Sequence, residues 1–383
     1  MKKRLLLAVT GSIAAYKSAD LVRQLTKAGH SVTCVLSESA QKFVSKFLLE
    51  NLSENRCYTD DDLWTELNLH IHLARDHDAL IIAPASANTL SKCAQGFADN
   101  LVTNIILAFE GPVLLAPAMH TEMMTQPVIR QNMALCKQLG HFVIGPSYGE
   151  LASHDTGFGR FVDPAIITAV VPALFFKRLN LSTCSLIITS GGTKEAIDPV
   201  RHISNASSGM LGRQLSYMAL LYGAKTSLFS TTDVENIGYH TFARCESASE
   251  LYTALHAAID EHDALIMAAA VSDFKVAYSE KKVKRNSGMN SLEISANEDI
   301  LKSLADKKGS KRFIGFNLSD AADLEKESIR KCNEKGCDYI VGNTPGNFAE
   351  ATRSYKVFDS KALQFEKEAV PLAEAAYDVL SLI

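Results

Sequence analysis

The chain has 383 residues, more than one typical domain, so two domains are expected. Hydrophobic residues make up 47% and charged residues 21%, which is ordinary for a globular protein with buried cores. The formal net charge of −4 excludes a polyelectrolyte, and no nucleic-acid partner is expected. Scattered cysteines without a CxxC pair favour a reducing, cytoplasmic compartment, and the short apolar runs predict no membrane association.

The start of the chain, MKKRLLLAVT, has the superficial look of a signal peptide. Its apolar run is short, so we interpret residues 4–10 as a first strand that ends at Gly11-Ser12. An amphipathic helix follows and stops at Gly29, and a second strand is predicted over 31–37.

The same order of elements recurs in the second half. A strand is predicted from residue 185, a helix opens after Gly209, and another strand covers 225–230. The pentapeptide His-Asp-Ala-Leu-Ile occurs at both 77–81 and 262–266, each time entering an apolar strand. Strands that alternate with helices predict parallel sheets covered by helices on both faces.

The fold class is therefore α/β, with two tandem doubly wound Rossmann-like domains. The boundary is expected near 177–184, where a helical FFKRLN run gives way to a new strand, so the domains are taken as 1–178 and 179–383. Ligands of such folds bind beyond the carboxyl ends of the strands, which directs attention to the turns that follow each strand.

Small polar residues follow three predicted strands of the first half. Gly11 and Ser12 would present backbone N–H groups to a phosphate, although the turn is not a GxGxxG dinucleotide fingerprint. PASANT at 84–89 offers hydroxyl and amide groups to a polar ring or a phosphate, and PAMHTEM at 117–123 follows the next strand.

Together, GSIAAYK, PASANT, ADNLV at 98–102 and PAMxxxM resemble the flavin-dependent cysteine decarboxylases over roughly residues 1–175. Phosphopantothenoylcysteine decarboxylase is the best match. The resemblance implies a flavodoxin-like fold, FMN at the strand ends, a trimer that shares it, and conversion of 4′-phosphopantothenoylcysteine to 4′-phosphopantetheine. It implies that FMN is bound by Gly11, Ser12, Ile13, Ser37, Ser86 and Asn88.

The same resemblance assigns the base beside the substrate thiol to His70, in the stretch HIHLA at 70–74. Histidine suits proton transfer near neutral pH. A metal site at His70 and His72 is the competing interpretation, since an i, i+2 pair suits a strand, but the sequence offers no evident third ligand.

Two residues depart from the pattern of that family. His120 stands where the family has an asparagine that contacts the substrate carboxylate, which a protonated histidine could also grip. Ser153 stands where the family has a flap cysteine that protonates the last intermediate, and a serine is a far poorer acid. His154 or Asp155 could donate that proton, or the flap only closes the site. The alternative is a flavin-binding half with impaired or only oxidative decarboxylation, serving assembly or regulation.

The second half has its own small-residue turns at strand ends. TSGGT at 189–193 and SNASSG at 204–209 would form an anion-binding nest, and AAAVSDF at 268–274 follows a later strand. A basic run, KKVKR at 281–285, comes next. That run is either a solvated charged face or part of the site.

TSGGTxExIDPVRxISNxSSG, AAVxDF and KKVKR resemble phosphopantothenate–cysteine ligase over roughly residues 180–383. The resemblance implies that 4′-phosphopantothenate attacks CTP to give an acyl-cytidylate, with Mg²⁺ present, and that cysteine displaces CMP. Such chemistry depends mainly on charge neutralisation and alignment. Sequence does not separate CTP from ATP.

The ligase resemblance assigns the catalytic lysine to Lys282, with Lys284 as its rival. Asn205 is assigned to the acyl intermediate, and Asp273 to the nucleotide or its Mg²⁺. The remaining nucleotide contacts are Asn297, Glu298, Asp299, Ile300, Phe316, Lys331 and Lys335. Trimers of the first half and dimers of the second predict a homo-oligomer, a dodecamer.

Overall fold

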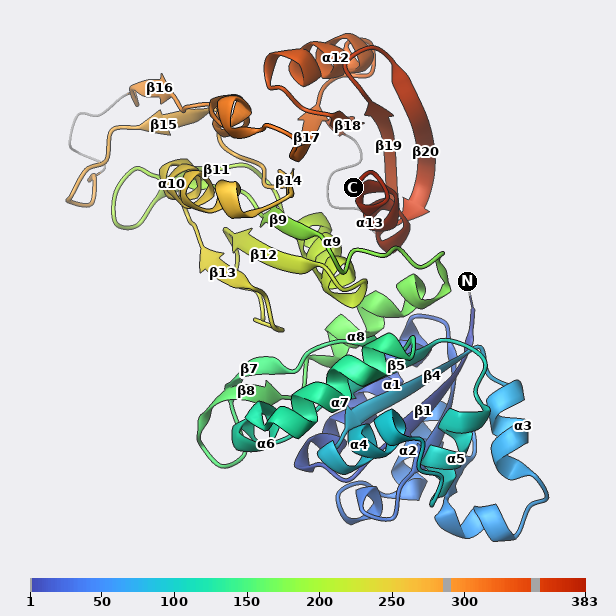
Figure 1. Cartoon of the computed structure of the whole chain (residues 1–383). Helices are drawn as coiled ribbons and strands as arrows, with labels where there is room; N and C mark the ends of the chain where they lie inside the picture. The colour runs from blue at the N-terminus through green and yellow to red at the C-terminus, as the bar shows by residue number, and fades with distance from the viewer. Residues whose placement is uncertain (1, 285–290, 346–351) are drawn as a thin grey trace. The chain divides into compact units, whose positions relative to one another are not determined.

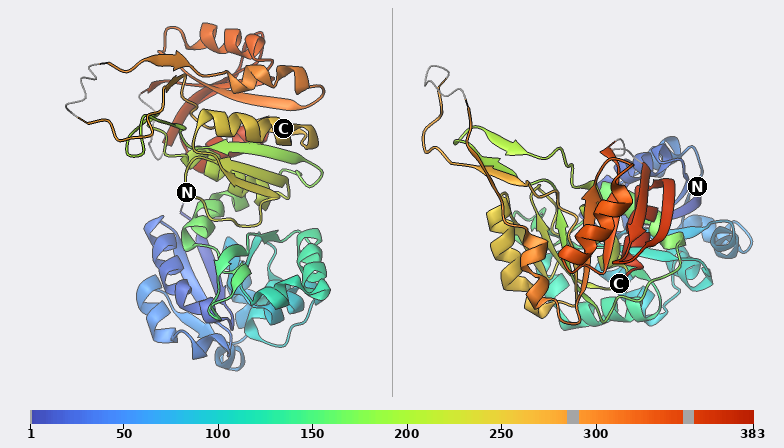
Figure 2. Two further views of the ribbon diagram at one scale, coloured as in Figure 1. Left: turned by 90° about the vertical axis from the view of Figure 1, so that its left-hand side faces the viewer. Right: turned by 90° about the horizontal axis from the view of Figure 1, so that it is seen from above.

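Two α/β units make up the chain in the computed structural model, which describes residues 2–284, 291–345 and 352–383 (Figure 1). The first unit comprises Met1–Arg178 and Glu235–Gly238, and the second comprises Leu179–Val234 and Tyr239–Ile383. In both units, helices lie on the two faces of a central sheet (Figure 2).

The first unit has a six-stranded, all-parallel sheet in the order β3-β2-β1-β4-β5-β6. The doubly wound α/β class is confirmed. The order is the Rossmann one, not the 2-1-3-4-5 order of a flavodoxin-like fold, because β2 and β3 both lie on one side of β1 before the chain crosses back to β4. The strands are β1 (Arg4–Val9), β2 (Ser31–Leu36), β3 (Cys57–Thr59), β4 (Ala79–Ala85), β5 (Val113–Pro117) and β6 (Phe142–Val143).

Helices cover both faces of this sheet, so β4 is buried along its whole length. One face carries α1 (Ser18–Lys27), α2 (Lys46–Ser53) and α8 (Pro164–Val170). The other carries α3 (Leu69–Arg75), α4 (Ala87–Gln95), α5 (Leu101–Ala108) and α7 (Pro127–Gln138), which share one hydrophobic core with the strands.

The short elements of the first unit surround the carboxyl ends of its strands or connect it to the second unit. The run predicted to be helical through FFKRLN ends earlier, since η4 stops at Phe175 and Phe176 has an extended backbone. These elements are η1 (Ile13–Lys17), η2 (Ala40–Lys42), η3 (Asp60–Trp64), α6 (Thr121–Thr125), the antiparallel hairpin β7 (Ser147–Glu150) and β8 (Thr156–Arg160), and η4 (Val171–Phe175).

The second unit repeats the order of the first and extends it. Its sheet runs β13-β12-β9-β14-β17-β18-β19-β20, where the first six strands are parallel and the last two antiparallel. These strands are β9 (Ser185–Ser190), β12 (Lys225–Ser230), β13 (Thr241–Arg244), β14 (Ala264–Ile266), β17 (Arg312–Leu318), β18 (Tyr339–Asn343), β19 (Thr352–Phe358) and β20 (Leu363–Pro371).

Helices and two small hairpins complete the second unit. The hairpin of β15 and β16 lies away from the main sheet of its unit (Figure 1). The helices are α9 (Met210–Leu221), α10 (Ala248–Ala258), η5 (Ile259–Glu261), α11 (Ile300–Ser303), η6 (Ala305–Lys307), α12 (Leu324–Glu334) and α13 (Leu372–Leu380). The hairpins are β10 (Lys194–Ala196) with β11 (His202–Ser204), and β15 (Phe274–Val276) with β16 (Ile294–Ala296).

Candidate active sites

The first unit has a cavity of about 810 Å³ where its strand order reverses, between β1 and β4. This is the position at which doubly wound folds bind ligands, and the volume suits a cofactor-sized molecule. The cavity brings together five of the residues predicted from sequence: Gly11, Ser12, Ile13, Ser86 and His120.

Close packing explains why small residues occupy the turn after β1. A β-carbon at Gly11 would lie 2.4 Å from Cβ of Ser39, so a side chain cannot be accommodated without movement. Ser12 is the N-cap of η1. The hydroxyl of Thr10 donates to the Pro84 carbonyl at 2.7 Å and accepts from the Ser86 N–H at 2.9 Å. The turns after β1 and β4 are therefore joined by hydrogen bonds through Thr10 beside the cavity.

Three other predicted residues of the first unit do not line this cavity. Ser37 lies just after β2, on the turn that packs against Gly11, and its Oγ accepts from the Ala40 N–H at 3.3 Å. Asn88 is exposed in the first turn of α4. His70 is half-buried on α3.

The predicted base His70 has a buried Nδ1 atom that contacts no hydrogen-bond partner within the described residues. The metal alternative at His70 and His72 gains no support. The two residues lie on a helix rather than a strand, His72 is exposed, and the described ranges contain no group of three potential metal-binding side chains.

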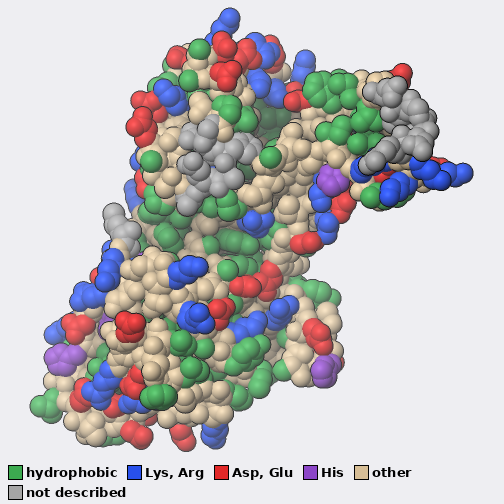
Figure 3. Space-filling view, turned by 180° about the vertical axis from the view of Figure 1, so that it is seen from behind, with side chains coloured by type: hydrophobic (Ala, Val, Ile, Leu, Met, Phe, Trp, Pro, Cys, Tyr) green, Lys and Arg blue, Asp and Glu red, His purple; other side chains and the backbone are tan. Residues whose placement is uncertain are grey.

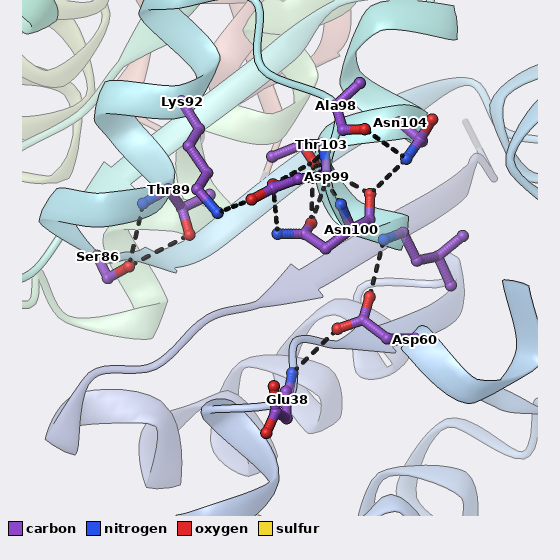
Figure 4. Close-up of polar contacts among 11 residues, drawn as sticks. Glu38, Asp60, Ser86, Thr89, Lys92, Ala98, Asp99, Asn100, Thr103 and Asn104 are labelled. Atoms are coloured by element: carbon purple, nitrogen blue, oxygen red, sulfur yellow. Dashed lines mark hydrogen bonds and ion pairs between the residues drawn. The ribbon is translucent and has the colours of Figure 1, made fainter.

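The ADNLV run has a structural function at the same edge of the sheet (Figure 4). Asn100 is the N-cap of α5 and accepts from the Thr103 N–H at 3.0 Å. The carboxylate of Asp60 accepts from the Leu101 N–H at 2.7 Å and from the Glu38 N–H at 3.3 Å. The start of α5 is thereby connected to the loops after β2 and β3.

His120 makes a polar cluster with the β7–β8 hairpin. Its Nε2 lies 2.8 Å from Ser153 Oγ and 3.1 Å from Asp155 Oδ2, and its Nδ1 faces the carboxylate of Glu122. Hydrogen bonds from Ser153 and His120 hold the pKa of Asp155 below its usual value. His154 points elsewhere, since its ring pairs with Glu150 at 3.1 Å and its side chain is 89% exposed.

Sequence reasoning missed several residues of this cavity. Lys17 and Arg160 bring two cations to its lining, and Tyr16 and Met123 also contribute. Tyr16 and Lys17 end the motif GSIAAYK and Met123 ends PAMHTEM, so these motifs were the signal that could have found them.

The second unit has a cavity of about 740 Å³ at the equivalent reversal, between β9 and β14. It collects nearly all of the residues that the sequence assigned to the nucleotide and the acyl intermediate. They are Asn205, Asp273, Asn297, Glu298, Asp299, Ile300, Phe316, Lys331 and Lys335.

Glycines allow close backbone approach in this cavity as well. A β-carbon at Gly192 would lie 2.7 Å from the Asn205 carbonyl oxygen. Gly209, the N-cap of α9, has φ of +71°, a conformation that side chains rarely adopt. The amide of Asn205 donates to the carbonyls of Ala270 and Val271, at 3.3 and 3.1 Å, which fixes the turn against the end of β14.

Lys331 of α12 and Lys335, the C-cap of that helix, place positive charge in the wall of the cavity. Burial, and then the nearby charge of Lys335, lower the pKa of Lys331, whose Nζ donates to Asn317 Oδ1 at 2.7 Å. Lys335 pairs with Asp299 at 2.9 Å. Asn317 of β17, Asn343 of β18 and Arg353 of β19 also line the cavity and were not assigned from the sequence.

Lys282 does not line the cavity, although the sequence placed it among the catalytic and CTP-binding residues. Basic side chains gather on the arm of the second unit that bears the β15–β16 hairpin (Figure 3). Both Lys282 and Lys284 are exposed there, and Arg285 of the same run lies outside the described residues. β15, which precedes this run, pairs with β16 in a hairpin apart from the main sheet (Figure 1).

The backbone between these lysines is held by an ion pair between a buried aspartate, Asp198, and an exposed arginine, Arg201. The side chain of Asp198 is fully buried, and its Oδ2 accepts from the Val283 N–H at 3.1 Å. Arg201 donates to the Val283 carbonyl at 2.6 Å and lowers the pKa of Asp198.

Two family models match successive parts of the chain. Residues 1–175 match the family described as Flavoprotein, and residues 181–383 match the DNA/pantothenate metabolism flavoprotein C-terminal domain. The coenzyme A biosynthesis bifunctional protein CoaBC of Bacillus subtilis (strain 168) is 36% identical over 351 residues, covering 89% of this chain and 86% of that protein.

Two solved structures each correspond to about half of the chain. The FMN binding protein AtHal3 is 38% identical, covers 46% of this chain and 97% of its own, and gives a TM-score of 0.42. The C-terminal domain of CoaBC is 28% identical, covers 53% and 95%, and gives a TM-score of 0.46. No helix among the described residues is long and apolar enough to cross a membrane.

The fold and the two cavities define a tandem α/β protein in which a flavoprotein unit precedes a pantothenate-metabolism unit. The chain belongs to the CoaBC family of bifunctional coenzyme A biosynthesis proteins.

Proposed function

We propose that the second unit joins 4′-phosphopantothenate to cysteine with CTP, and that the first unit decarboxylates the resulting 4′-phosphopantothenoylcysteine to 4′-phosphopantetheine with FMN. The observation that carries the proposal is the pair of cavities at the two strand-order reversals, each lined by residues assigned from sequence. Membership of the CoaBC family supports both activities in one chain.

The first cavity suits FMN because the turn of small residues after β1, with Gly11 and Ser12 at the N-terminal end of η1, forms part of its lining. The residues that would hold the cofactor are Gly11, Ser12, Ile13 and Ser86. Bound flavin supplies an acceptor for two electrons from the cysteinyl group and returns them later. His70 is the proposed base for the thiol proton.

A site shared between subunits would explain why His70, Ser37 and Asn88 lie outside the cavity of a single chain. The buried Nδ1 of His70 lacks a partner among the described residues, which supports a role that needs a second copy. The trimer, and a dodecamer with dimers of the second unit, are therefore part of the proposal, as is a cytoplasmic location.

In the second unit, Lys331 and Lys335 would neutralise the triphosphate of CTP, and Asp273 would bind the accompanying Mg²⁺. Asn205 would orient the acyl-cytidylate. Lys282 would reach it from the segment whose backbone is held by the hydrogen bond between the Val283 N–H and Asp198. The remaining lining residues, Asn297, Glu298, Asp299, Ile300 and Phe316, would contact the nucleotide.

The alternative for the first unit is a flavin-binding half that serves only assembly or regulation. No observation on the described residues favours this alternative.

An anaerobic assay of the full chain with 4′-phosphopantothenate, cysteine and CTP tests the proposal. We expect CMP that depends on both other substrates, then CO₂ and 4′-phosphopantetheine. Absence of CMP would contradict the ligase, and an oxidised ene-thiol as sole final product would contradict full decarboxylation. Lys282→Gln should abolish CMP formation, while Lys281→Gln, its neighbour in the basic run, serves as the matched control.

A further inference from the structure

A buried amide of the main sheet holds one lysine of the second cavity in place. Asn317, near the carboxyl end of β17, is only 2% exposed. Its Oδ1 accepts from Lys331 Nζ at 2.7 Å and from Ser319 Oγ at 3.1 Å, and its Nδ2 donates to Ser328 Oγ at 3.0 Å. Lys331 and Ser328 both belong to α12, so Asn317 joins this helix to β17 beside the cavity.

The chemistry of these partners fixes the direction of the Asn317 amide. An ammonium group only donates hydrogen bonds, so the atom that faces Lys331 must be the carbonyl oxygen. The amide nitrogen then faces Ser328, whose hydroxyl can accept. Ser328 is fully buried, and a β-carbon at Gly342 of the neighbouring strand β18 would lie only 3.0 Å from its Oγ. Lys331 is therefore held by a fixed acceptor that carries no charge.

The positive charge of Lys331 is not paired with a carboxylate. Glu327 stands four residues earlier on α12, the spacing at which a glutamate commonly pairs with a lysine. Glu327 instead lies 2.7 Å from Arg330, and no carboxylate of the described residues lies within 4.0 Å of Lys331 Nζ. Lys335 does have such a partner, since it pairs with Asp299 at 2.9 Å. Of the two cavity lysines, Lys331 is the one whose charge is left uncompensated.

Resting on the proposed ligase function, we propose that Asn317 is a positioning residue, which directs Lys331 at the nucleotide triphosphate and leaves the charge of the lysine available to it. A carboxylate in this place would hold the same ammonium but would also neutralise it, as Asp299 does for Lys335. The amide orders the long lysine side chain before the nucleotide binds, which lowers the entropic cost of binding. Asn317 thus strengthens triphosphate binding through Lys331 and needs no contact with the nucleotide itself.

The substitution Asn317→Asp changes the charge with almost no change of shape. A second carboxylate oxygen replaces Nδ2, and the Ser328 hydroxyl can donate to it, so the link between β17 and α12 remains. We expect the Kd of the full chain for CTP with Mg²⁺, measured by isothermal titration calorimetry, to rise roughly ten-fold or more, because one charged contact to the triphosphate is lost.

Two comparisons separate this effect from a structural one. Binding of CMP, which lacks the outer two phosphates, should weaken far less than binding of CTP in Asn317→Asp, and equal weakening of both nucleotides would overturn the proposal. Asn333→Asp adds the same charge to α12 at an exposed position outside the cavity. This control should keep the wild-type Kd for CTP.

A double-mutant cycle tests whether Asn317 acts through Lys331. In the Lys331→Gln background, adding Asn317→Asp should change the Kd for CTP by less than about two-fold, because the charge that it neutralises is already absent. Effects that multiply as independent changes would overturn the proposal. If Asn317→Asp fails to fold, Asn317→Ala serves in the same cycle, and we expect a several-fold rise in Kd that also disappears in Lys331→Gln.

The proposal and the ligase function fail in different ways. A wild-type chain that binds CTP, together with an unchanged Kd in Asn317→Asp, would overturn the positioning role alone. A folded wild-type chain that binds no CTP would contradict the ligase function and the positioning role with it.

Discussion

Asp78 and Asp263 hold equivalent positions in the two units. Asp78 Oδ2 accepts from the backbone N–H of Arg4, at the start of β1, at 2.7 Å. Asp263 Oδ2 accepts from that of Ser185, at the start of β9, at 2.8 Å. Asp78 therefore joins the beginnings of β1 and β4, and Asp263 joins the beginnings of β9 and β14. Both aspartates lie at the end of their sheet opposite the cavity.

The histidine before each aspartate is equivalent too. Nδ1 of His77 lies 2.8 Å from the Leu73 carbonyl, and Nδ1 of His262 lies 2.8 Å from the Ala258 carbonyl. The repeated His-Asp-Ala-Leu-Ile is thus a structural element of the fold, which connects a helix end to the sheet, and its residues do not line the two cavities described above.

We expect Asp78→Ala to lower the free energy of unfolding of the first unit by about 1–2 kcal/mol, as a half-buried hydrogen bond to a charged group is lost. The bond to the Arg4 N–H lowers the pKa of Asp78 in the fold. Its stabilisation is therefore complete above the unfolded-state pKa of about 3.9 and is lost as pH falls through the lower folded value.

Urea unfolding followed by circular dichroism at several pH values measures this effect. The difference between wild type and Asp78→Asn should shrink below about pH 4, where the carboxylate takes up a proton. Asp76→Ala, at an exposed neighbouring position, is the control and should leave stability nearly unchanged. A difference that grows toward acid pH would contradict the assignment.

Local sequence predicted the ligand ends of both sheets well, because each apolar strand is followed by a turn of small residues. Gly11, Ser12 and Ser86 come together for that reason, as do Asn205 and Asp273. The antiparallel strands β19 and β20 were not predicted, since pairing at a sheet edge depends on long-range contacts.

Contacts that depend on the path of a hairpin also could not be predicted from the sequence. The meeting of His120 and Ser153 requires the fold of β7 and β8, and spacing along the chain carries no sign of it. Lys282 was predicted to contact a nucleotide by motif alone, and it does not line the cavity of the second unit.

Glycine replacement should separate the two activities. Gly11→Ala forces a β-carbon to within 2.4 Å of Ser39 Cβ, so the turn after β1 must deform and FMN should be lost. Gly192→Ala meets the Asn205 carbonyl at 2.7 Å and should abolish CMP formation. Flavin absorbance and CMP release should be measured in both variants, because each variant should lose one of the two and keep the other. Full flavin content in Gly11→Ala would argue against this turn as the phosphate site.

Lys331 of α12 and its C-cap Lys335 should determine nucleotide affinity. Loss of one charged contact to a phosphate costs about 1.5–3 kcal/mol, so Lys331→Gln should raise the KM for CTP roughly 10- to 100-fold. Lys335→Gln should act in the same direction and also release Asp299. Lys326→Gln, exposed on the same helix, is the matched control. An unchanged KM in Lys331→Gln would show that the triphosphate lies elsewhere.

The buried carboxylate of Asp198 should control the ligase through the segment that bears Lys282. Asp198→Ala removes the acceptor for the Val283 N–H and the ion-pair partner of Arg201, so the segment between Lys282 and Lys284 loses its attachment. We expect the kcat for CMP formation to fall at least ten-fold, roughly 1.4 kcal/mol in activation free energy.

Because Asp198 does not line the nucleotide cavity, the KM for CTP should change little in Asp198→Ala. Asp198→Asn keeps an acceptor oxygen and should recover part of the kcat, whereas a merely unfolded variant would lose CTP binding as well. Asp233→Ala, an exposed aspartate of the same unit, controls for loss of charge. Equal loss of kcat and of CTP affinity in Asp198→Ala would mean that the pair supports the whole unit and does not position the lysine segment in particular.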